Sequence, residues 1–121
     1  MKILAVDHVQ ITVPPESVEA ARAFYCETLG LTEIEKPDAL RGRGGFWLQI
    51  GGFQVHVGTE GAVERGRTKA HVAYQVDELE RWRYFLMARG FELKEPVAIP
   101  GVERFEFRDP FGNRVELLQI K

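Results

Sequence analysis

An internal repeat is the strongest constraint on the fold of this chain. The segment DHVQITV at Asp7 to Val13 resembles AHVAYQV at Ala70 to Val76, and each is followed by a helical pattern that ends at a glycine. Further along, GFWLQIGGFQVHVG at Gly45 to Gly58 aligns with RFEFRDPFGNRVELL at Arg104 to Leu118 when one extra turn residue is allowed. A repeat of this kind defines the architecture before single elements are considered. Each half is therefore predicted to run strand, helix, strand, strand, strand.

Both predicted helices have start and stop signals. The first begins with Ser17 as N-cap and ends at Gly30, and the second begins with Asp77 as N-cap and ends at Gly90. A serine or aspartate side chain accepts a hydrogen bond from the first turn, and glycine readily takes the left-handed conformation that closes a helix. We therefore expect one helix in each half.

A polar, glycine-containing segment separates the halves. TEGAVERGRT, residues 59–68, is interpreted as a linker between module one, at about 4–58, and module two, at about 69–121. A chain of 121 residues is long enough for one domain with its own hydrophobic core. We predict a single domain, residues 1–121, built from the two modules.

The charge and hydropathy of the chain argue against two classes of partner. Sixteen basic and 18 acidic side chains give a net charge of -2, without a block of like charges that would attract nucleic acid. No window approaches the roughly 20 apolar residues that a membrane-spanning helix needs. The N-terminal residues also lack the long apolar run of a signal peptide. The expectation is a cytoplasmic protein that binds neither nucleic acid nor membrane.

Alternation along the predicted strands assigns polar and apolar side chains to opposite faces. In the first strand, for example, His8 and Gln10 lie opposite Val9 and Ile11. All three histidines of the chain and one glutamate fall at repeat-equivalent positions on such polar faces: His8, His56, His71 and Glu116. A solvated sheet face is the alternative, but such a face more often carries Lys, Glu, Ser and Thr than histidine. Because imidazole and carboxylate are common metal ligands, we favour a divalent metal site.

Other polar-face residues are candidates for the walls of a substrate pocket. By the same alternation these are Gln10, Trp47 and Gln54. Arg104 and Arg108 flank Glu106 on a strand whose other face is aromatic, and they are candidates for binding an anionic substrate group. A solvated outer face is the alternative for this charged trio. The run DALRGRGG, residues 38–45, lacks the strand-to-helix context of a phosphate loop, so we interpret it as a flexible loop near the mouth of the site.

Four motifs make the chain resemble the vicinal oxygen chelate superfamily, which includes glyoxalase I, extradiol dioxygenases, fosfomycin-resistance proteins and bleomycin-binding proteins. They are VDHVQITV, FYCETLGL, KAHVAYQVDEL and FRDPFGNRVELLQ, and the last is the most specific. The resemblance covers nearly the whole chain. It implies an α+β fold in which two paired βαβββ modules form an eight-stranded, incompletely closed barrel. It also implies a homodimer, and a divalent metal bound on the inner face by His8, His56, His71 and Glu116.

The chain departs from glyoxalase-like members at His56, where those enzymes usually carry a glutamate. An imidazole there leaves one formal negative charge around a divalent ion, which favours an anionic substrate. It also removes one candidate general base. Without His56, the set His8, His71 and Glu116 has the composition of the two-histidine, one-carboxylate triad of Fe(II) oxygenases. Whether His56 binds metal or acts as a base stays open at this point.

The resemblance implies a metal-dependent enzyme of lyase or isomerase type. Neighbouring oxygens of a small substrate would chelate the metal, which is one of Fe, Mn, Ni, Co or Zn. Glu116 would then be both a ligand and the catalytic proton carrier. Two alternatives stay open, an Fe(II)-dependent dioxygenase and a metal-free small-molecule binding protein like the bleomycin-resistance members.

Overall fold

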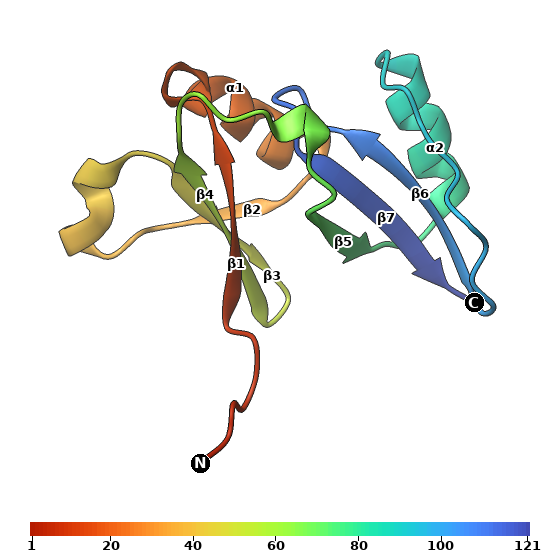
Figure 1. The fold of residues 1–121 in the computed structure, drawn as a ribbon, viewed down its shortest axis with the longest axis horizontal. Helices are drawn as coiled ribbons and strands as arrows, with labels where there is room; N and C mark the ends of the chain where they lie inside the picture. The colour runs from red at the N-terminus through yellow and green to blue at the C-terminus, as the bar shows by residue number, and fades with distance from the viewer. The chain divides into compact units, whose positions relative to one another are not determined.

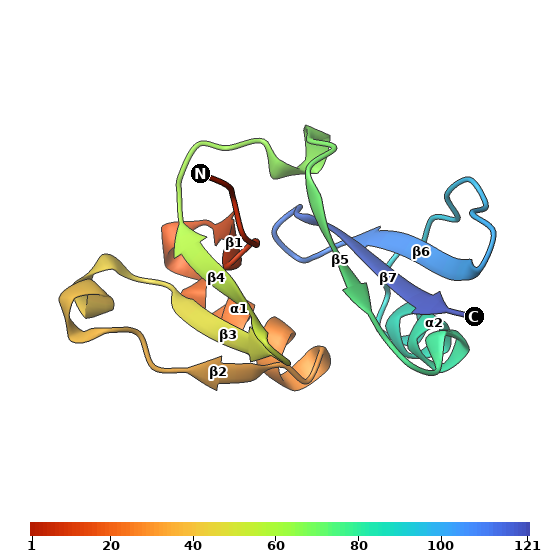
Figure 2. The same cartoon turned by 90° about the horizontal axis from the view of Figure 1, so that it is seen from below.

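The protein consists of two compact units, Met1–Val63 and Glu64–Lys121 (Figures 1 and 2). The structure is a computed structural model, and it describes residues 1–121. The division between them falls inside the segment 59–68 that the sequence suggested as a linker. Each unit contains an open mixed sheet and a helical segment, which confirms the α+β prediction.

The first unit contains a four-stranded sheet in the order β1-β4-β3-β2. Its strands are β1 (His8–Val13), β2 (Thr32–Ile34), β3 (Phe46–Ile50) and β4 (Phe53–Thr59). β1 pairs with β4 in parallel, and the other two pairs are antiparallel. In this register His56 on β4 lies beside Gln10 on β1 and beside Trp47 on β3. The polar residues predicted for one face are therefore neighbours across three strands.

A helical segment connects β1 to β2 and covers the apolar face of the sheet. It is a 3₁₀ turn (Pro15–Ser17), then α1 (Val18–Arg22) and a π-helical segment (Ala23–Thr28). The guanidinium carbon of Arg22 lies 5.0 Å above the ring of Phe46 on β3, which places the helix over that face. The buried apolar residues of this unit are Val13, Ala21, Phe24, Tyr25, Leu29, Phe46, Leu48, Val55 and Val57. Gly30 ends the segment at φ 75°, as predicted.

The second unit repeats this arrangement with one strand fewer. Its sheet has the order β5-β7-β6, made of β5 (His71–Gln75), β6 (Val102–Arg108) and β7 (Arg114–Ile120), and a 3₁₀ turn (Arg65–Arg67) precedes β5. The expected strand FELKE is reduced to a single bridge between Lys94 and Glu106. Pro96 and Pro100 follow this bridge, and proline has no N–H to donate to a ladder. The eighth strand expected here therefore does not continue beyond this bridge.

The helix α2 (Leu79–Ala88) packs on the apolar face of this second sheet (Figure 1). The guanidinium carbon of Arg83 lies 4.9 Å above the ring of Phe105 on β6. The buried apolar residues are Leu79, Leu86, Phe105, Phe107, Val115 and Leu117. Gly90, at φ 88°, follows the end of the helix as predicted. No helix in the structure combines the length and apolar character needed to cross a membrane.

The prediction that Asp77 caps α2 is wrong. The N-cap residue is Glu78, which takes a left-handed conformation and makes no side-chain cap bond. Instead, the backbone N–H of Leu79 donates to Oε1 of Gln119 on β7, at 2.9 Å. This acceptor is 40 residues away in sequence, so a local capping pattern gives no sign of it.

Gln119→Ala is expected to lower the free energy of unfolding by about 1 kcal/mol, the usual cost of losing a side-chain cap. The N–H of Leu79 loses its acceptor in this variant. The matched control is Asp77→Ala, which should change stability by less than about 0.5 kcal/mol. Chemical denaturation measures both, and a larger effect of the control would identify Asp77 as the cap.

Candidate functional site

Three aromatic rings form a stack on the polar face of the first sheet. The indole of Trp47 and the imidazole of His56 are parallel within 2°, with centroids 3.8 Å apart. The ring of His8 stacks on His56 at 4.0 Å and 18°. His56 therefore lies between the other two rings and is buried. The pKa of His56 is lowered below its ordinary value, mainly by burial and to a smaller extent by the nearby His8. Its ring is therefore neutral at pH 7.

A cavity of about 540 Å³ opens beside this stack. Its walls include the strand residues His8, Gln10, Trp47, Gln54 and His56, and the loop residues Lys36, Leu40 and Arg43. The structure thus brings together the three pocket residues expected in the first module, Gln10, Trp47 and Gln54, with the two histidines of that module. The side chain of Gln10 fits here because Gly58 has no side chain. A Cβ at Gly58 would lie only 2.6 Å from Nε2 of Gln10.

The loop between β2 and β3 extends from the first sheet (Figure 2). Its residues Lys36, Leu40 and Arg43 form one wall of the cavity. It contains a 3₁₀ turn (Asp38–Arg43), and Nζ of Lys36 donates to the carbonyl of Gly44 at 2.6 Å. Gly45 has φ 77°, and a Cβ there would lie 2.0 Å from the carbonyl oxygen of Val57. Only glycine allows the loop to pass so close to β4.

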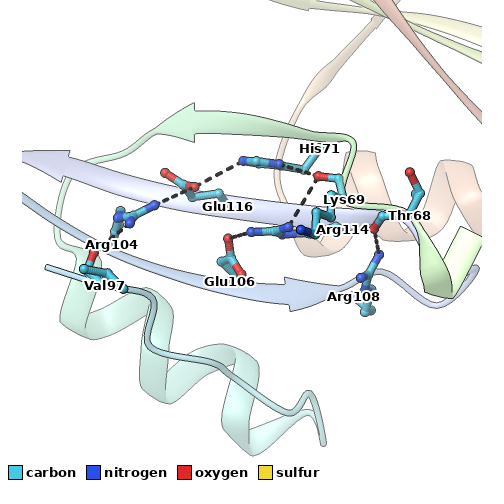
Figure 3. Close-up of polar contacts among 9 residues, drawn as sticks. All are labelled: Thr68, Lys69, His71, Val97, Arg104, Glu106, Arg108, Arg114 and Glu116. Carbon is cyan, nitrogen blue, oxygen red and sulfur yellow. Dashed lines mark hydrogen bonds and ion pairs between the residues drawn. The ribbon is translucent and has the colours of Figure 1, made fainter. Parts of the chain in front are cut away.

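In the second unit, buried carboxylates and arginines share the polar face of the sheet (Figure 3). Glu106 and Glu116 are directly opposite each other on β6 and β7. Oε1 of Glu116 lies 3.3 Å from Nε2 of His71 and 3.2 Å from Nη1 of Arg104, while Glu106 pairs with Arg114. Arg104 and Arg114 offset the cost of burying the two carboxylates.

Three potential ligand atoms in this unit lie close together. One atom each from His71, Glu106 and Glu116 lies within 4.8 Å of the others. Two ligands of one ion are at most about 4.4 Å apart, because each bond is about 2.0 to 2.2 Å long. Small side-chain shifts would therefore bring the three atoms around one ion. Sequence alternation placed Glu106 on this face but did not identify it as a ligand; its register opposite Glu116 is the signal that finds it.

His8 and His71 both use Nδ1 for a hydrogen bond to an oxygen. Nδ1 of His8 lies 2.9 Å from Oδ2 of Asp7, and Nδ1 of His71 lies 2.9 Å from the carbonyl of Lys69. Both oxygens are acceptors, so Nδ1 carries a hydrogen in each ring, while Nε2 of His71 faces Oε1 of Glu116 at 3.3 Å. Metal-binding histidines are oriented in this way by their second nitrogen. The donors of the second unit, His71, Glu106 and Glu116, therefore fit a divalent metal.

The two arginines expected to bind substrate already have protein partners. Arg104 donates to Glu116 and, through Nη2, to the carbonyl of Val97 at 2.7 Å, while its buried Nε has no partner. Nη1 of Arg108 donates to three carbonyls, those of Arg65 at 3.2 Å, Thr68 at 3.1 Å and Gly112 at 3.2 Å. Arg108 thus braces the segment that leads into β5, whereas Arg104 lies directly beside Glu116.

The motif DPFGN is a structural turn between β6 and β7. The carboxylate of Asp109 accepts hydrogen bonds from the backbone N–H groups of Phe111, at 2.9 Å, and Asn113, at 2.8 Å. Gly112 has φ 102°, and a Cβ there would lie 3.0 Å from the backbone nitrogen of Gly66. The turn sets the register that places Glu106 opposite Glu116.

The four predicted metal ligands form two pairs, one in each unit. His8 and His56 stack in the first unit, and His71 and Glu116 are in contact in the second.

Comparison with known proteins gives one family and a group of solved structures. Residues 5–117 match the model of the Glyoxalase/Bleomycin resistance protein/Dioxygenase superfamily. A glyoxalase family protein from Bacillus anthracis is 40% identical, with a TM-score of 0.89, over 100% of this chain and 98% of that one. No curated protein matches.

Two further structures share the fold at lower identity. The fosfomycin resistance protein FosX from Listeria monocytogenes, complexed with Mn(II) and sulfate, is 22% identical with a TM-score of 0.77, over 99% of this chain and 93% of that one. TnmS3, an antibiotic binding protein from Streptomyces sp. CB03234, is 23% identical with a TM-score of 0.67, over 98% of this chain and 100% of that one.

Proposed function

The chain belongs to the Glyoxalase/Bleomycin resistance protein/Dioxygenase superfamily, and from this membership we propose that it is a metal-dependent enzyme of lyase or isomerase type. The observation that carries the proposal is the cluster of His71, Glu106 and Glu116, whose potential ligand atoms lie within 4.8 Å of one another. Nδ1 of His8 and Nδ1 of His71 each lie against an oxygen acceptor, as in metal-binding histidines. We propose His8, His71 and Glu116 as ligands of one divalent ion.

Imidazole and carboxylate donors without a thiolate suit Mn, Fe, Co, Ni or Zn. The Mn(II) in the FosX complex supports an ion of this kind. When bound, the ion supplies Lewis-acid charge that stabilises negative charge developing on a substrate oxygen.

Glu116 is the residue that we propose to move the proton. Arg104 and His71 both contact its Oε1 atom, so Oε2 is the oxygen left for a substrate proton. In an isomerisation, this carboxylate takes a proton from one carbon and returns it to the neighbouring carbon, which requires hydrogen-bond reach to both. Glu106 is less suited, because its carboxylate is engaged with Arg114.

We propose a small anionic substrate that enters the cavity of the first unit. The cavity wall carries two cationic side chains, Lys36 and Arg43, against one carboxylate, Asp7. The amides of Gln10 and Gln54 supply hydrogen-bond donors and acceptors, and Trp47 supplies an apolar surface. An excess of positive charge in a concave site concentrates anions near it.

Metal analysis of protein purified without a histidine tag is expected to find one divalent ion per chain. His8→Ala and Glu116→Ala should each weaken metal binding by at least about 100-fold, because each removes a ligand. The control is Glu103→Ala, since this carboxylate pairs with Lys121 and takes no part in the site. Absence of metal, with stability unchanged by a chelator, would instead favour a metal-free binding protein.

An Fe(II)-dependent dioxygenase is the second candidate, favoured by the two-histidine, one-carboxylate composition of the proposed ligands. Oxygen uptake by Fe(II)-loaded protein with catechols distinguishes the two functions. We expect no uptake above that of a sample without protein. Stoichiometric oxygen consumption that Glu116→Ala abolishes would establish the dioxygenase.

We also propose that the protein is a homodimer. The segment before β1 exposes several apolar side chains, with Ile3 at 95% and Leu4 at 90% exposure, and exposed apolar side chains gathered in one segment are typical of interaction surfaces. Light scattering should give twice the chain mass of 13.8 kDa. The double variant Ile3→Ser/Leu4→Ser should weaken association by at least about 10-fold, from the loss of apolar burial, while Lys2→Ser should not. A wild-type monomer at micromolar concentration would contradict the proposal.

A further inference from the structure

We propose that Arg43 is a specificity-determining residue that binds a carboxylate group of the substrate in the cavity of the first unit. The inference rests on the proposed function and deepens it, because it names the anionic group and the side chain that binds it. It depends only on residues of the first unit. It is carried by which polar groups of the cavity wall already have partners inside the protein.

Arg43 is the charged side chain of the cavity wall that has no partner in the chain. The other cation, Lys36, donates from Nζ to the carbonyl of Gly44 at 2.6 Å, and Oδ2 of Asp7 lies 2.9 Å from Nδ1 of His8. The guanidinium of Arg43 makes no hydrogen bond, ion pair or ring contact with another residue. Its N–H donors are therefore open to a ligand.

The two amides of the cavity wall differ in the same way. Nε2 of Gln54 donates to Oε1 of Gln49 at 3.4 Å, and Oε1 of Gln54 lies 2.9 Å from Nε2 of His56. The side-chain amide of Gln10 has no hydrogen-bond partner in the protein, and it occupies the space that Gly58 leaves by having no side chain. Gln10 therefore adds an unpaired N–H donor to the same cavity.

The neighbouring arginine of the same loop has the opposite environment. Nε of Arg41 lies 3.2 Å from Oδ1 of Asp38, and Nη2 of Arg41 lies 3.5 Å from Oε2 of Glu35. Arg41 also lies outside the cavity wall. Of two arginines two residues apart, the loop thus neutralises one and leaves the other without a counter-charge beside a cavity.

The backbone next to Arg43 is anchored on both sides. Gly44 and Gly45 follow the 3₁₀ turn with φ of 76° and 77°, and a Cβ at Gly45 would lie 2.0 Å from the carbonyl oxygen of Val57 on β4. The hydrogen bond from Lys36 to Gly44 joins the two ends of the loop. The backbone that carries Arg43 is therefore held against β4 before a ligand arrives, which reduces the ordering that binding requires.

The charge and shape of the open groups match a carboxylate better than a phosphate. Two cations, Lys36 and Arg43, against one carboxylate, Asp7, give the wall one net positive charge, which a single carboxylate balances. A phosphate group carries about −1.5 to −2 at pH 7, which leaves an excess of negative charge beside Asp7. The planar guanidinium binds both oxygens of a carboxylate at once. Leu40 and Trp47 supply an apolar surface for the rest of the molecule.

An NMR titration of the nitrogen-15-labelled, full-length chain with three small probes tests the proposal. A chelator removes metal beforehand, so that no probe binds through an ion. Benzoate is expected to shift the Nε–H signal of Arg43 saturably. Benzamide has the same shape without the charge and should bind at least about 10-fold more weakly. Inorganic phosphate should also bind more weakly than benzoate.

Equal binding of benzoate and benzamide would overturn the proposal, because the charge of the ligand would then have no effect. Binding of phosphate at Arg43 as tight as that of benzoate would overturn the choice of a carboxylate.

Variants of the two arginines locate the effect. Arg43→Gln removes the charge and should weaken benzoate binding about 10-fold, with little change for benzamide. Arg43→Lys restores the charge without the planar fork and should recover part of the affinity. The matched control, Arg41→Gln, should bind benzoate as the wild type does, and circular dichroism confirms that each variant folds. Wild-type affinity in Arg43→Gln, or an equal loss in Arg41→Gln, would show that Arg43 does not bind the carboxylate.

Metal binding measured on the same proteins separates this inference from the proposed function. Arg43→Gln should keep the metal affinity of the wild type, since Arg43 is not among the proposed ligands. If the wild type binds a divalent ion but benzoate binding does not depend on Arg43, the carboxylate site alone is wrong. If no ion binds and benzoate affinity still depends on Arg43, the metal-dependent enzyme is wrong and the carboxylate site stands.

Discussion

The parallel pairing of the first and last strands within each unit is the constraint on which the site depends. Parallel strands cannot be joined by a tight turn, so a helix and the intervening strands, β2 and β3 in the first unit and β6 in the second, serve as the connection. The pairing of β1 with β4 places His8 within stacking distance of His56, and the pairing of β5 with β7 places His71 in contact with Glu116. Because the helices cover the apolar face of each sheet, the opposite face is left for polar chemistry. One topological rule, used twice, thus produces both halves of the candidate ligand set.

Burial of Glu116 is the second condition that the fold must satisfy. The residue is only 5% exposed, and an ionised carboxylate in such a place needs compensating charge and hydrogen bonds. Arg104 supplies both at 3.2 Å, and Glu106 receives the same support from Arg114. Two buried carboxylates matched by two arginines give a face that is polar yet nearly neutral. A divalent ion beside Glu116 would therefore meet a carboxylate that already pairs with Arg104.

Period-two alternation predicted most of the fold and the faces of the strands, because apolar and polar side chains alternate along β1, β4, β5 and β7. It did not predict features that depend on distant partners. The Asp77 cap was wrong because Gln119, 40 residues from Leu79, supplies the acceptor. Glu106 was not recognised as a potential ligand, because its position opposite Glu116 depends on the register between β6 and β7. The roles of the histidines could not be read from sequence at all, since they depend on which oxygen each ring nitrogen meets.

Under the proposed function, the imidazole at His56 also bears on the charge of the substrate. With His8, His71 and Glu116 as ligands, one negative charge faces a divalent ion, so the centre keeps one net positive charge. The glutamate usual in glyoxalase-like enzymes at the position of His56 would cancel that charge. The cavity beside His56 adds the positive charges of Lys36 and Arg43. Under the proposed function, the imidazole of His56 in place of a carboxylate and the cationic loop thus act in the same direction. Each raises the electrostatic attraction of the site for an anion.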